Sequence, residues 1–318
     1  MGKIDLSCFG KTGEAQSVLA MGCGFPGFAG FDRSVETVRK AFDLGIRYFD
    51  TSVMYRSGAS QAILGEALAN RTEPHFLATK VGYFREASHF RSVEALHVQL
   101  RENLRLLRRD SVDLLQIHEA DWANWWMDRA DVVPCDLFDE EGSYDFANAP
   151  VIQFLREAKA SGLCRHIGIT GNNARHLGRL IRELDGIDAV LVAYNYSPLN
   201  VTAREFVLAP AQAKNMAVIV AGIFTFPFSL PKGWRTEGTY FGRHTDRQFE
   251  ELQKLQKASG LPMAELCVRF VADDERLSRI LVGACHPAEI EQNVAAYERG
   301  NLPADLHAAV EAIAGQFD

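Results

Sequence analysis

The chain has 318 residues, of which 47% are apolar and 24% are charged, and its formal net charge is −7 at pH 7. This balance is that of a globular protein and excludes a largely disordered or fibrous chain. A negative net charge without Lys/Arg clusters also gives no attraction to the phosphates of nucleic acid or to anionic lipid. We therefore expect no nucleic acid or membrane partner, and a small molecule as the ligand.

The six cysteines are scattered and include no C-x-x-C pair. Such spacing predicts neither a disulfide framework nor a structural zinc site and is typical of a reducing compartment. The first residues, MGKIDLSCFGKTGEAQS, contain no apolar segment of signal-peptide length, and the most apolar stretch, at 216–230, is too short to span a bilayer. We expect a cytoplasmic protein.

In chain order, a short apolar run is followed by a turn and then by an amphipathic helical pattern, and this unit recurs along the sequence. The predicted strands lie near residues 17–21, 46–49, 75–79, 112–117, 166–169, 188–193, 217–221 and 279–282. The predicted helices cover residues 34–44, 60–68, 92–107, 150–160, 174–184, 203–214, 246–258 and 287–298.

Eight such units predict a (β/α)8 TIM barrel, a single α/β domain over residues 1–318, because no linker or break in composition divides the chain. A doubly wound open sheet is the alternative, and it is disfavoured because no G-x-G-x-x-G turn follows an early strand. Two connections are long: 118–149 follows the fourth strand and 222–245 follows the seventh. Both should lie at the carboxyl ends of the strands, where barrels of this kind carry their sites.

Polar side chains stand at the ends of three successive predicted strands. Asp50 ends the second strand, Lys80 the third and His118 the fourth, while Tyr55 lies in the loop after the second. A phenol is a poor acid or base at neutral pH, and a neighbouring ammonium favours the phenolate and lowers its pKa. An imidazole can orient a carbonyl oxygen. Each residue alone has an ordinary structural explanation, but together they predict proton transfer between an alcohol and a carbonyl.

The sequence resembles the aldo-keto reductases, on segments that stand in that family's usual order: FDTSVMY, LATK, SVDLLQIH, GITGNN, YNYSPL and VGACHPAEIEQNVAA. The resemblance implies that Tyr55 is the general acid/base, that Lys80 and Asp50 tune it, and that His118 positions the substrate carbonyl. It also implies an extended NAD or NADP at the barrel mouth. IGITG and TKVGYFREASHF are most similar to NAD-linked sugar dehydrogenases of the L-galactose dehydrogenase kind.

The same resemblance implies the cofactor contacts, which are Gly22, Gly24, Asp50, Thr170, Gly171, Asn172, Gly222, Phe224, Gly283, His286, Glu289, Gln292 and Asn293. Several depart from the familiar reductases. Thr170-Gly171 stands where they have Ser-Asn, and Leu191 where they have Gln. The usual aromatic residue after the seventh strand is replaced by Ala221-Gly222, with Phe224 as a candidate substitute.

The choice between NAD and NADP depends on charge near the adenosine 2′-phosphate, because an unpaired phosphate in a groove is costly. In the turn after the eighth strand, His286 is the one potential cation and Glu289 repels phosphate. We therefore favour NAD slightly. Cations of the loop after the seventh strand are the alternative source of charge: Lys232, Arg235 and Arg243.

Aromatic residues at the barrel mouth suit a sugar, because an aromatic ring stacks on its apolar face. The candidate substrate contacts are Phe25, Trp122 and Trp125, together with Tyr55 and His118, although the tryptophans could equally form the private core of their loop. No metal site is expected. Two other functions stay open, namely a catalytically silent barrel that senses nucleotides and a metal-dependent barrel hydrolase. Substrate, reaction direction and oligomeric state are left undetermined.

Overall fold

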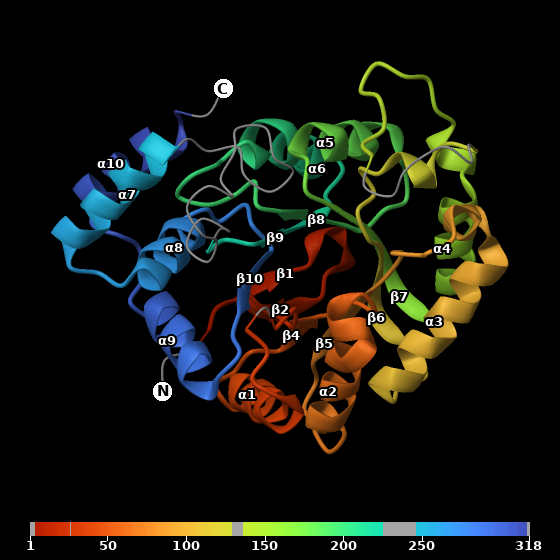
Figure 1. The fold of residues 1–318 in the computed structure, drawn as a ribbon, viewed down its shortest axis with the longest axis horizontal. Coiled ribbons are helices and arrows are strands. Elements are labelled where there is room, and N and C mark those ends of the chain that lie inside the picture. Colours follow the sequence, from red (N-terminus) through yellow and green to blue (C-terminus); the bar gives the residue numbers. More distant parts are fainter. Residues whose placement is uncertain (1–3, 26, 129–135, 225–245, 317–318) are drawn as a thin grey trace.

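The computed structural model describes residues 4–25, 27–128, 136–224 and 246–316. Eight parallel strands close into a barrel in the order β10-β3-β4-β5-β6-β7-β8-β9, with helices around it (Figure 1). The strands are β3 Leu19–Gly22, β4 Tyr48–Asp50, β5 Phe76–Val81, β6 Val112–Ile117, β7 Cys164–Gly171, β8 Ala189–Ala193, β9 Ala217–Ala221 and β10 Arg279–Gly283. The predicted (β/α)8 barrel is thus confirmed.

The barrel strands are apolar throughout because both of their faces are buried. Inward-facing side chains fill the interior, and a second, larger apolar cluster joins the outer strand faces to the helices. Strand register is continuous around the closure, where Gly283 of β10 pairs with Gly22 of β3 and Gly22 pairs with Asp50 of β4. This register brings the carboxyl ends of neighbouring strands to one rim.

Most of the helices that cover the barrel match the predicted periodic segments, and α6 and α8 are the exceptions. The covering helices are α1 Phe31–Asp43, α2 Ala59–Leu68, α3 Val93–Leu107, α4 Pro150–Ala160, α5 Ala174–Glu183, α6 Ala209–Ala213, α8 Met263–Ala272 and α9 Pro287–Glu298. Side-chain caps begin two of them, since Ser92 accepts the Ala95 N–H and Asn173 accepts the N–H groups of Arg175 and His176. The predicted helix at 203–214 is instead a π-helical turn, Arg204–Leu208, followed by the short α6.

The helix expected between the seventh and eighth strands needs a correction. Residues 246–258 do form a helix, α7 Asp246–Ser259, but it packs against α10 Ala304–Ala314 outside the ring. Its place beside β10 is taken by α8, which contacts α9 and was not predicted. The reason is packing: α8 has the buried side chains Leu266, Val268 and Phe270 against the barrel.

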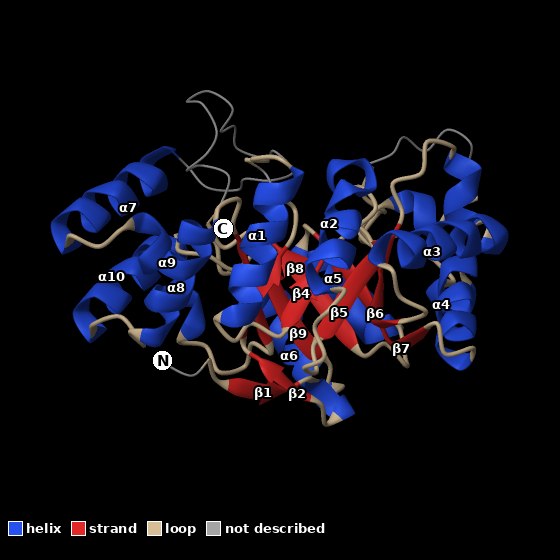
Figure 2. Cartoon of the chain, turned by 90° about the horizontal axis from the view of Figure 1, so that it is seen from below, coloured by secondary structure: helices blue, strands red, loops and turns tan. Residues whose placement is uncertain are grey.

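A small hairpin, β1 Leu6–Cys8 with β2 Ala15–Ser17, lies beneath the amino-terminal end of the barrel (Figure 2). Phe9, in its turn, packs on Tyr48 and Phe76 inside the barrel, so that end is filled by aromatic side chains. The opposite end carries the cavity. Lys232, Arg235 and Arg243, named as alternative phosphate-binding cations, lie outside the described residues. None of the described helices has the length and apolar character needed to cross a membrane.

Candidate active site

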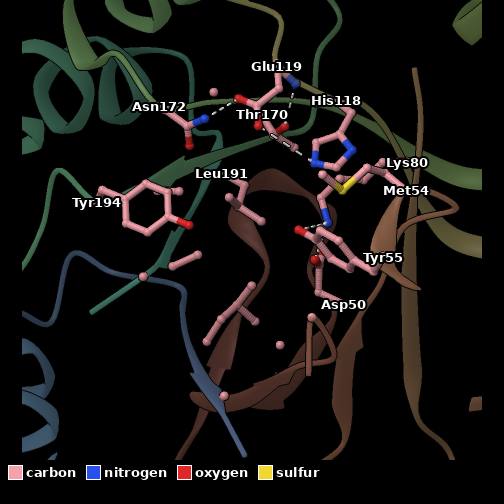
Figure 3. A pocket seen from close by; sticks show the side chains of 18 of the residues that line it. Asp50, Met54, Tyr55, Lys80, His118, Glu119, Thr170, Asn172, Leu191 and Tyr194 are labelled. Carbon is pink, nitrogen blue, oxygen red and sulfur yellow. Dashed lines mark hydrogen bonds and ion pairs between the residues drawn. The ribbon is translucent and has the colours of Figure 1, made fainter. Parts of the chain in front are cut away.

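A cavity of about 710 Å³ opens at the carboxyl ends of the barrel strands. It is lined by 12 of the predicted site residues, namely Gly22, Gly24, Asp50, Tyr55, Lys80, His118, Thr170, Gly171, Asn172, Gly222, Phe224 and Gly283. Figure 3 shows Tyr55, Lys80 and Asp50 grouped on one side of the cavity and Tyr194 on the other. The strand-end residues therefore do converge on one place.

Asp50 and Lys80 form a buried ion pair at the base of the cavity. The Lys80 Nζ donates to Asp50 Oδ1 and, at 2.9 Å, to the Thr51 carbonyl, and both side chains are at most 2% exposed. Gln116 Nε2 donates to the other Asp50 oxygen at 2.9 Å. Nζ lies 3.5 Å from the Tyr55 hydroxyl. The ammonium is thus held by acceptors on one side and directed at the phenol on the other.

The expectation that Lys80 lowers the pKa of Tyr55 is not met in the described structure. Burial, and after it the negative charges of Asp50 and Glu119, raise the pKa of Tyr55 well above its ordinary value of 10.0. Burial is the largest of these causes, and it decides the direction. The Tyr55 hydroxyl therefore keeps its proton at pH 7, and the Lys80 ammonium lies beside its oxygen.

The imidazole of His118 is neutral and is bonded to Ser52. Burial, and after it the charge of Lys80, lower the pKa of His118 well below 6.5, so the ring is neutral at pH 7. The Ser52 hydroxyl accepts the Met54 N–H at 3.1 Å and lies 2.9 Å from His118 Nδ1. The Ser52 hydroxyl can donate its proton to Nδ1 while it accepts from the backbone. In the tautomer that this bond favours, the ring proton is on Nε2, which can donate into the cavity.

Glu119 follows His118 directly and adds a carboxylate to the cavity wall, with 7% of its surface exposed. Its oxygens accept from the Tyr83 hydroxyl at 2.9 Å and from Asn172 Nδ2 at 2.5 Å. Its Oε1 lies 3.9 Å from His118 Nε2. The indole of Trp125 supports this turn from beneath by donating to the carbonyls of His118 and Glu119.

The end of β7 is held by a second buried acid. Asp121 Oδ2 accepts the N–H groups of Asn172 and Asn173 at 2.8 and 2.9 Å. Burial, and after it Glu119, raise the pKa of Asp121 well above 3.8. A Cβ at Gly171 would lie 2.9 Å from the Asp121 carboxyl carbon, which explains the glycine here. With its amide nitrogen bonded to Glu119, the Asn172 side chain is fixed at the cavity wall.

No aromatic residue directly follows β9, the seventh predicted strand, but Tyr194 at the end of the neighbouring β8 places a ring in the cavity. Tyr194 directly follows β8, lines the cavity and lies against Gly222, where an added Cβ would meet the ring at 2.4 Å. Gly222 also has φ +66, a value that favours glycine. Leu191 lines the cavity at the position where the resemblance led us to expect glutamine. Phe224, the predicted substitute, lines the cavity as well.

The turn between β10 and α9 is closed by its own acid. The Glu289 carboxylate accepts the N–H groups of Cys285 at 2.7 Å and His286 at 3.2 Å, completing a capping box at the start of α9. His286 and Gln292 are exposed, whereas Asn293 is buried and donates to the Gly283 carbonyl at 3.2 Å. These residues do not line the cavity itself.

Three predicted substrate contacts are not brought to the cavity. Trp122 and Trp125 are 2% and 0% exposed and pack among aromatic residues of their loop, which is the alternative that the sequence left open. Phe25 is fully buried, and its carbonyl accepts the Arg56 guanidinium at 2.7 Å. The physical reason is size, since large apolar rings are buried where a loop folds over a barrel rim.

Sequence reasoning missed Glu119, Tyr83 and Tyr194. Glu119 and Tyr194 each stand just after a strand, so applying the strand-end criterion to all strands would have found them. All three have positive φ, of 55°, 58° and 64°, a conformation that the sequence of a non-glycine residue does not reveal. In the described part of the chain, no group of three or more His, Cys, Asp or Glu is arranged to hold a metal ion.

The fold is a TIM barrel with a polar cavity at the carboxyl ends of its strands. The chain belongs to the aldo/keto reductase family, whose model matches residues 21–314. Members of this family act on small carbonyl and alcohol substrates and generally use NAD(P)H.

Among characterised relatives, the chain is 28% identical to L-galactose dehydrogenase of Arabidopsis thaliana, over 93% of this chain and 89% of that protein. It is 26% identical to D-threo-aldose 1-dehydrogenase of a Pseudomonas species, over 87% and 86% of the two chains. Its fold is similar to that of an aldo-keto reductase of Bacillus halodurans in its holo form, with a TM-score of 0.74, 22% identity and coverage of 98% and 96%. Sugar dehydrogenases are thus among its relatives.

Proposed function

We propose that this protein is an NAD(P)-dependent oxidoreductase that interconverts an alcohol and a carbonyl, on a sugar or a small aldehyde or ketone, with Tyr55 as the general acid/base. One observation carries the proposal. The Tyr55 hydroxyl lies 3.5 Å from Lys80 Nζ, whose charge is anchored by a buried Asp50, beside His118 in the same cavity. The dehydrogenase names of the two relatives described above favour an aldose as substrate.

In this proposal the carbonyl oxygen lies between the Tyr55 hydroxyl and the Nε2–H of His118. Both donate to it, and Tyr55 transfers its proton as the oxygen becomes an alkoxide. Lys80 stabilises the phenolate that remains, because its ammonium already lies beside that oxygen. Ser52 keeps His118 in the donating tautomer. In the oxidative direction the same groups act in reverse, and Tyr55 takes the proton from the alcohol.

The bound dinucleotide would supply or accept the hydride, and several residues of the cavity wall fit it. Cβ atoms added at Gly24 and Gly283 would meet nothing within 4 Å, so the rim is open there. Tyr194, fixed against Gly222, offers a ring face for the nicotinamide, and the Asn172 amide offers a polar contact for its carboxamide. These residues and Thr170 would hold the reactive end of the cofactor.

We further propose that NAD is preferred over NADP. Glu289 places a carboxylate on the N–H groups that begin α9, where a phosphate would otherwise find donors. A 2′-phosphate at this turn would therefore meet negative charge in place of free N–H groups. Glu289 is thus both a helix cap and a discriminator against phosphate.

The experiment is a titration of the purified protein with NADH and NADPH, followed by tryptophan fluorescence and then by turnover of a panel of aldoses and aldehydes. We expect tighter binding of NADH and turnover that chelators leave unchanged. Binding without turnover on any carbonyl or alcohol would favour the silent nucleotide-sensing barrel. Activity that disappears with a chelator would favour the metal-dependent hydrolase, and binding of neither nucleotide would overturn the proposal.

A further inference from the structure

Glu119 is the one acidic side chain in the described cavity lining besides Asp50, and its surroundings differ sharply from those of Asp50. The Asp50 carboxylate lies at the base and is neutralised by Lys80. Glu119 lies at the other edge of His118, with Oε1 3.9 Å from the Nε2 atom that faces the cavity (Figure 3). It therefore places carboxyl oxygens next to the position where His118 would hold a carbonyl oxygen.

The position of this carboxylate is built by several independent contacts. The Tyr83 hydroxyl and the Asn172 amide donate to one oxygen each, and the Glu119 N–H donates to Thr170 Oγ1 at 3.1 Å. The indole N–H of Trp125 donates to the Glu119 carbonyl at 3.0 Å. Two contacts hold the carboxylate and two hold the backbone of the same residue, so the orientation of the side chain is preorganised.

The backbone at this turn is strained in a way that stability alone does not explain. Glu119 and Tyr83 both have positive φ, of 55° and 58°, where glycine is favoured. Strained residues of this kind cluster at ligand sites, where the surrounding structure maintains them. Here the two strained residues place a phenol and a carboxylate in hydrogen-bond contact on the cavity wall, where both can also meet a polar ligand.

We infer that Glu119 accepts a hydrogen bond from the substrate hydroxyl on the carbon next to the reacting carbonyl, so that the enzyme selects 2-hydroxyaldehydes and aldoses over simple aldehydes. This inference rests on the proposed function, because it uses the carbonyl position set by Tyr55 and His118. Glu119 lines the cavity and its Oε1 lies 3.9 Å from His118 Nε2, so a substrate hydroxyl held beside His118 would be within reach of a carboxyl oxygen. A hydroxyl on the neighbouring carbon would lie close to Oε1 when the carbonyl oxygen contacts Nε2.

The test compares three aldehydes that differ by one hydroxyl: propanal, 2-hydroxypropanal and 3-hydroxypropanal, each reduced with NADH. The wild-type protein should prefer 2-hydroxypropanal over propanal in kcat/KM by about tenfold or more, as one charge-assisted hydrogen bond allows. Glu119→Gln should reduce this ratio by at least about fivefold, because it removes the charge and replaces one acceptor with a donor. The ratio for 3-hydroxypropanal should change less than about twofold.

Glu119→Asp is the matched control, because its side chain keeps the carboxyl group but is shorter by one methylene. It separates the presence of the carboxyl group from its reach into the cavity. If reach to the hydroxyl matters, Glu119→Asp should lose the 2-hydroxyl preference as Glu119→Gln does. Equal losses on all three aldehydes in both variants would show that Glu119 only orients His118, which overturns the inference. An unchanged preference would overturn it too. Absence of NADH oxidation with every aldehyde in the wild-type protein would instead contradict the proposed function itself.

Discussion

Replacement of Lys80 by Met should destabilise the protein strongly, because it leaves the Asp50 carboxylate buried without its counter-charge. Asp50 is 2% exposed, and its other side-chain hydrogen bond, from Gln116 at 2.9 Å, is to a neutral group. Breaking a buried ion pair by removing one partner costs about 3–5 kcal/mol. That is a large share of a typical total stability of about 5–15 kcal/mol.

The double variant Asp50→Asn/Lys80→Met separates the ion pair from the loss of packing. With both charges removed, no buried carboxylate is left unpaired, and an apolar side chain fills the space of the lysine stem. We expect the double variant to recover at least about half of the stability lost by Lys80→Met, although it should remain inactive. Tyr55→Phe, which removes only a 3.5 Å contact to Lys80, should cost less than about 1 kcal/mol.

The assay is urea denaturation at pH 7, followed by tryptophan fluorescence. It compares the wild type with Lys80→Met, Tyr55→Phe and the double variant Asp50→Asn/Lys80→Met. A loss below about 1 kcal/mol for Lys80→Met would refute the account, because it would mean that Asp50 is hydrated or uncharged. A double variant less stable than Lys80→Met would also refute the account, because the instability of Lys80→Met could then not be due to an unpaired Asp50 carboxylate.

Three further predictions concern Ser52, the turn that begins α9, and His118. Ser52→Ala should lower kcat/KM about tenfold with NADH affinity unchanged, Ser52→Thr should restore most of it, and a loss of cofactor binding would contradict the tautomer argument. Glu289→Gln keeps the cap and removes the charge, so it should improve the affinity for NADPH relative to NADH by about fivefold, and Glu289→Arg should improve it by more. If fluorescence titration shows an unchanged ratio of the two affinities, the adenosine lies elsewhere. Burial lowers the pKa of His118, so as the pH falls the unfolded chain binds a proton on this residue before the folded protein does. The free energy of unfolding should therefore fall as the pH drops below about 6.5, and His118→Gln should weaken that fall. If the free energies of unfolding of the wild type and His118→Gln fall in parallel during acid denaturation, a buried neutral ring is excluded.

The barrel and the positions of Asp50, Lys80 and His118 could be predicted because parallel strands direct their carboxyl ends to one rim. The apolar runs mark where each strand ends, and a polar residue just beyond it must face the mouth. Contacts between loops could not be predicted in this way. Glu119 meets Asn172 from another strand end, and Tyr194 lies against Gly222 at the end of the neighbouring strand. Both depend on tertiary packing and left-handed backbone that a single sequence does not encode locally.

The direction of the Tyr55 pKa shows the same limit. Sequence placed an ammonium beside the phenol, which by itself lowers the pKa, but burial depth and the opposing charges of Asp50 and Glu119 are properties of the folded cavity. The tryptophans are a second example. Trp122 and Trp125 follow a strand end as the polar residues do, yet their apolar rings are buried beneath the loop.

The most direct test of the central claim is a comparison of wild-type protein and Tyr55→Phe, with NADH affinity measured by tryptophan fluorescence and aldehyde reduction measured by loss of nicotinamide absorbance. The variant keeps the ring and removes only the hydroxyl that lies beside Lys80 Nζ. The account predicts a fall in kcat of about 10²–10⁴-fold with NADH affinity changed by less than about twofold. A variant that retains kcat within about tenfold of the wild type would contradict it.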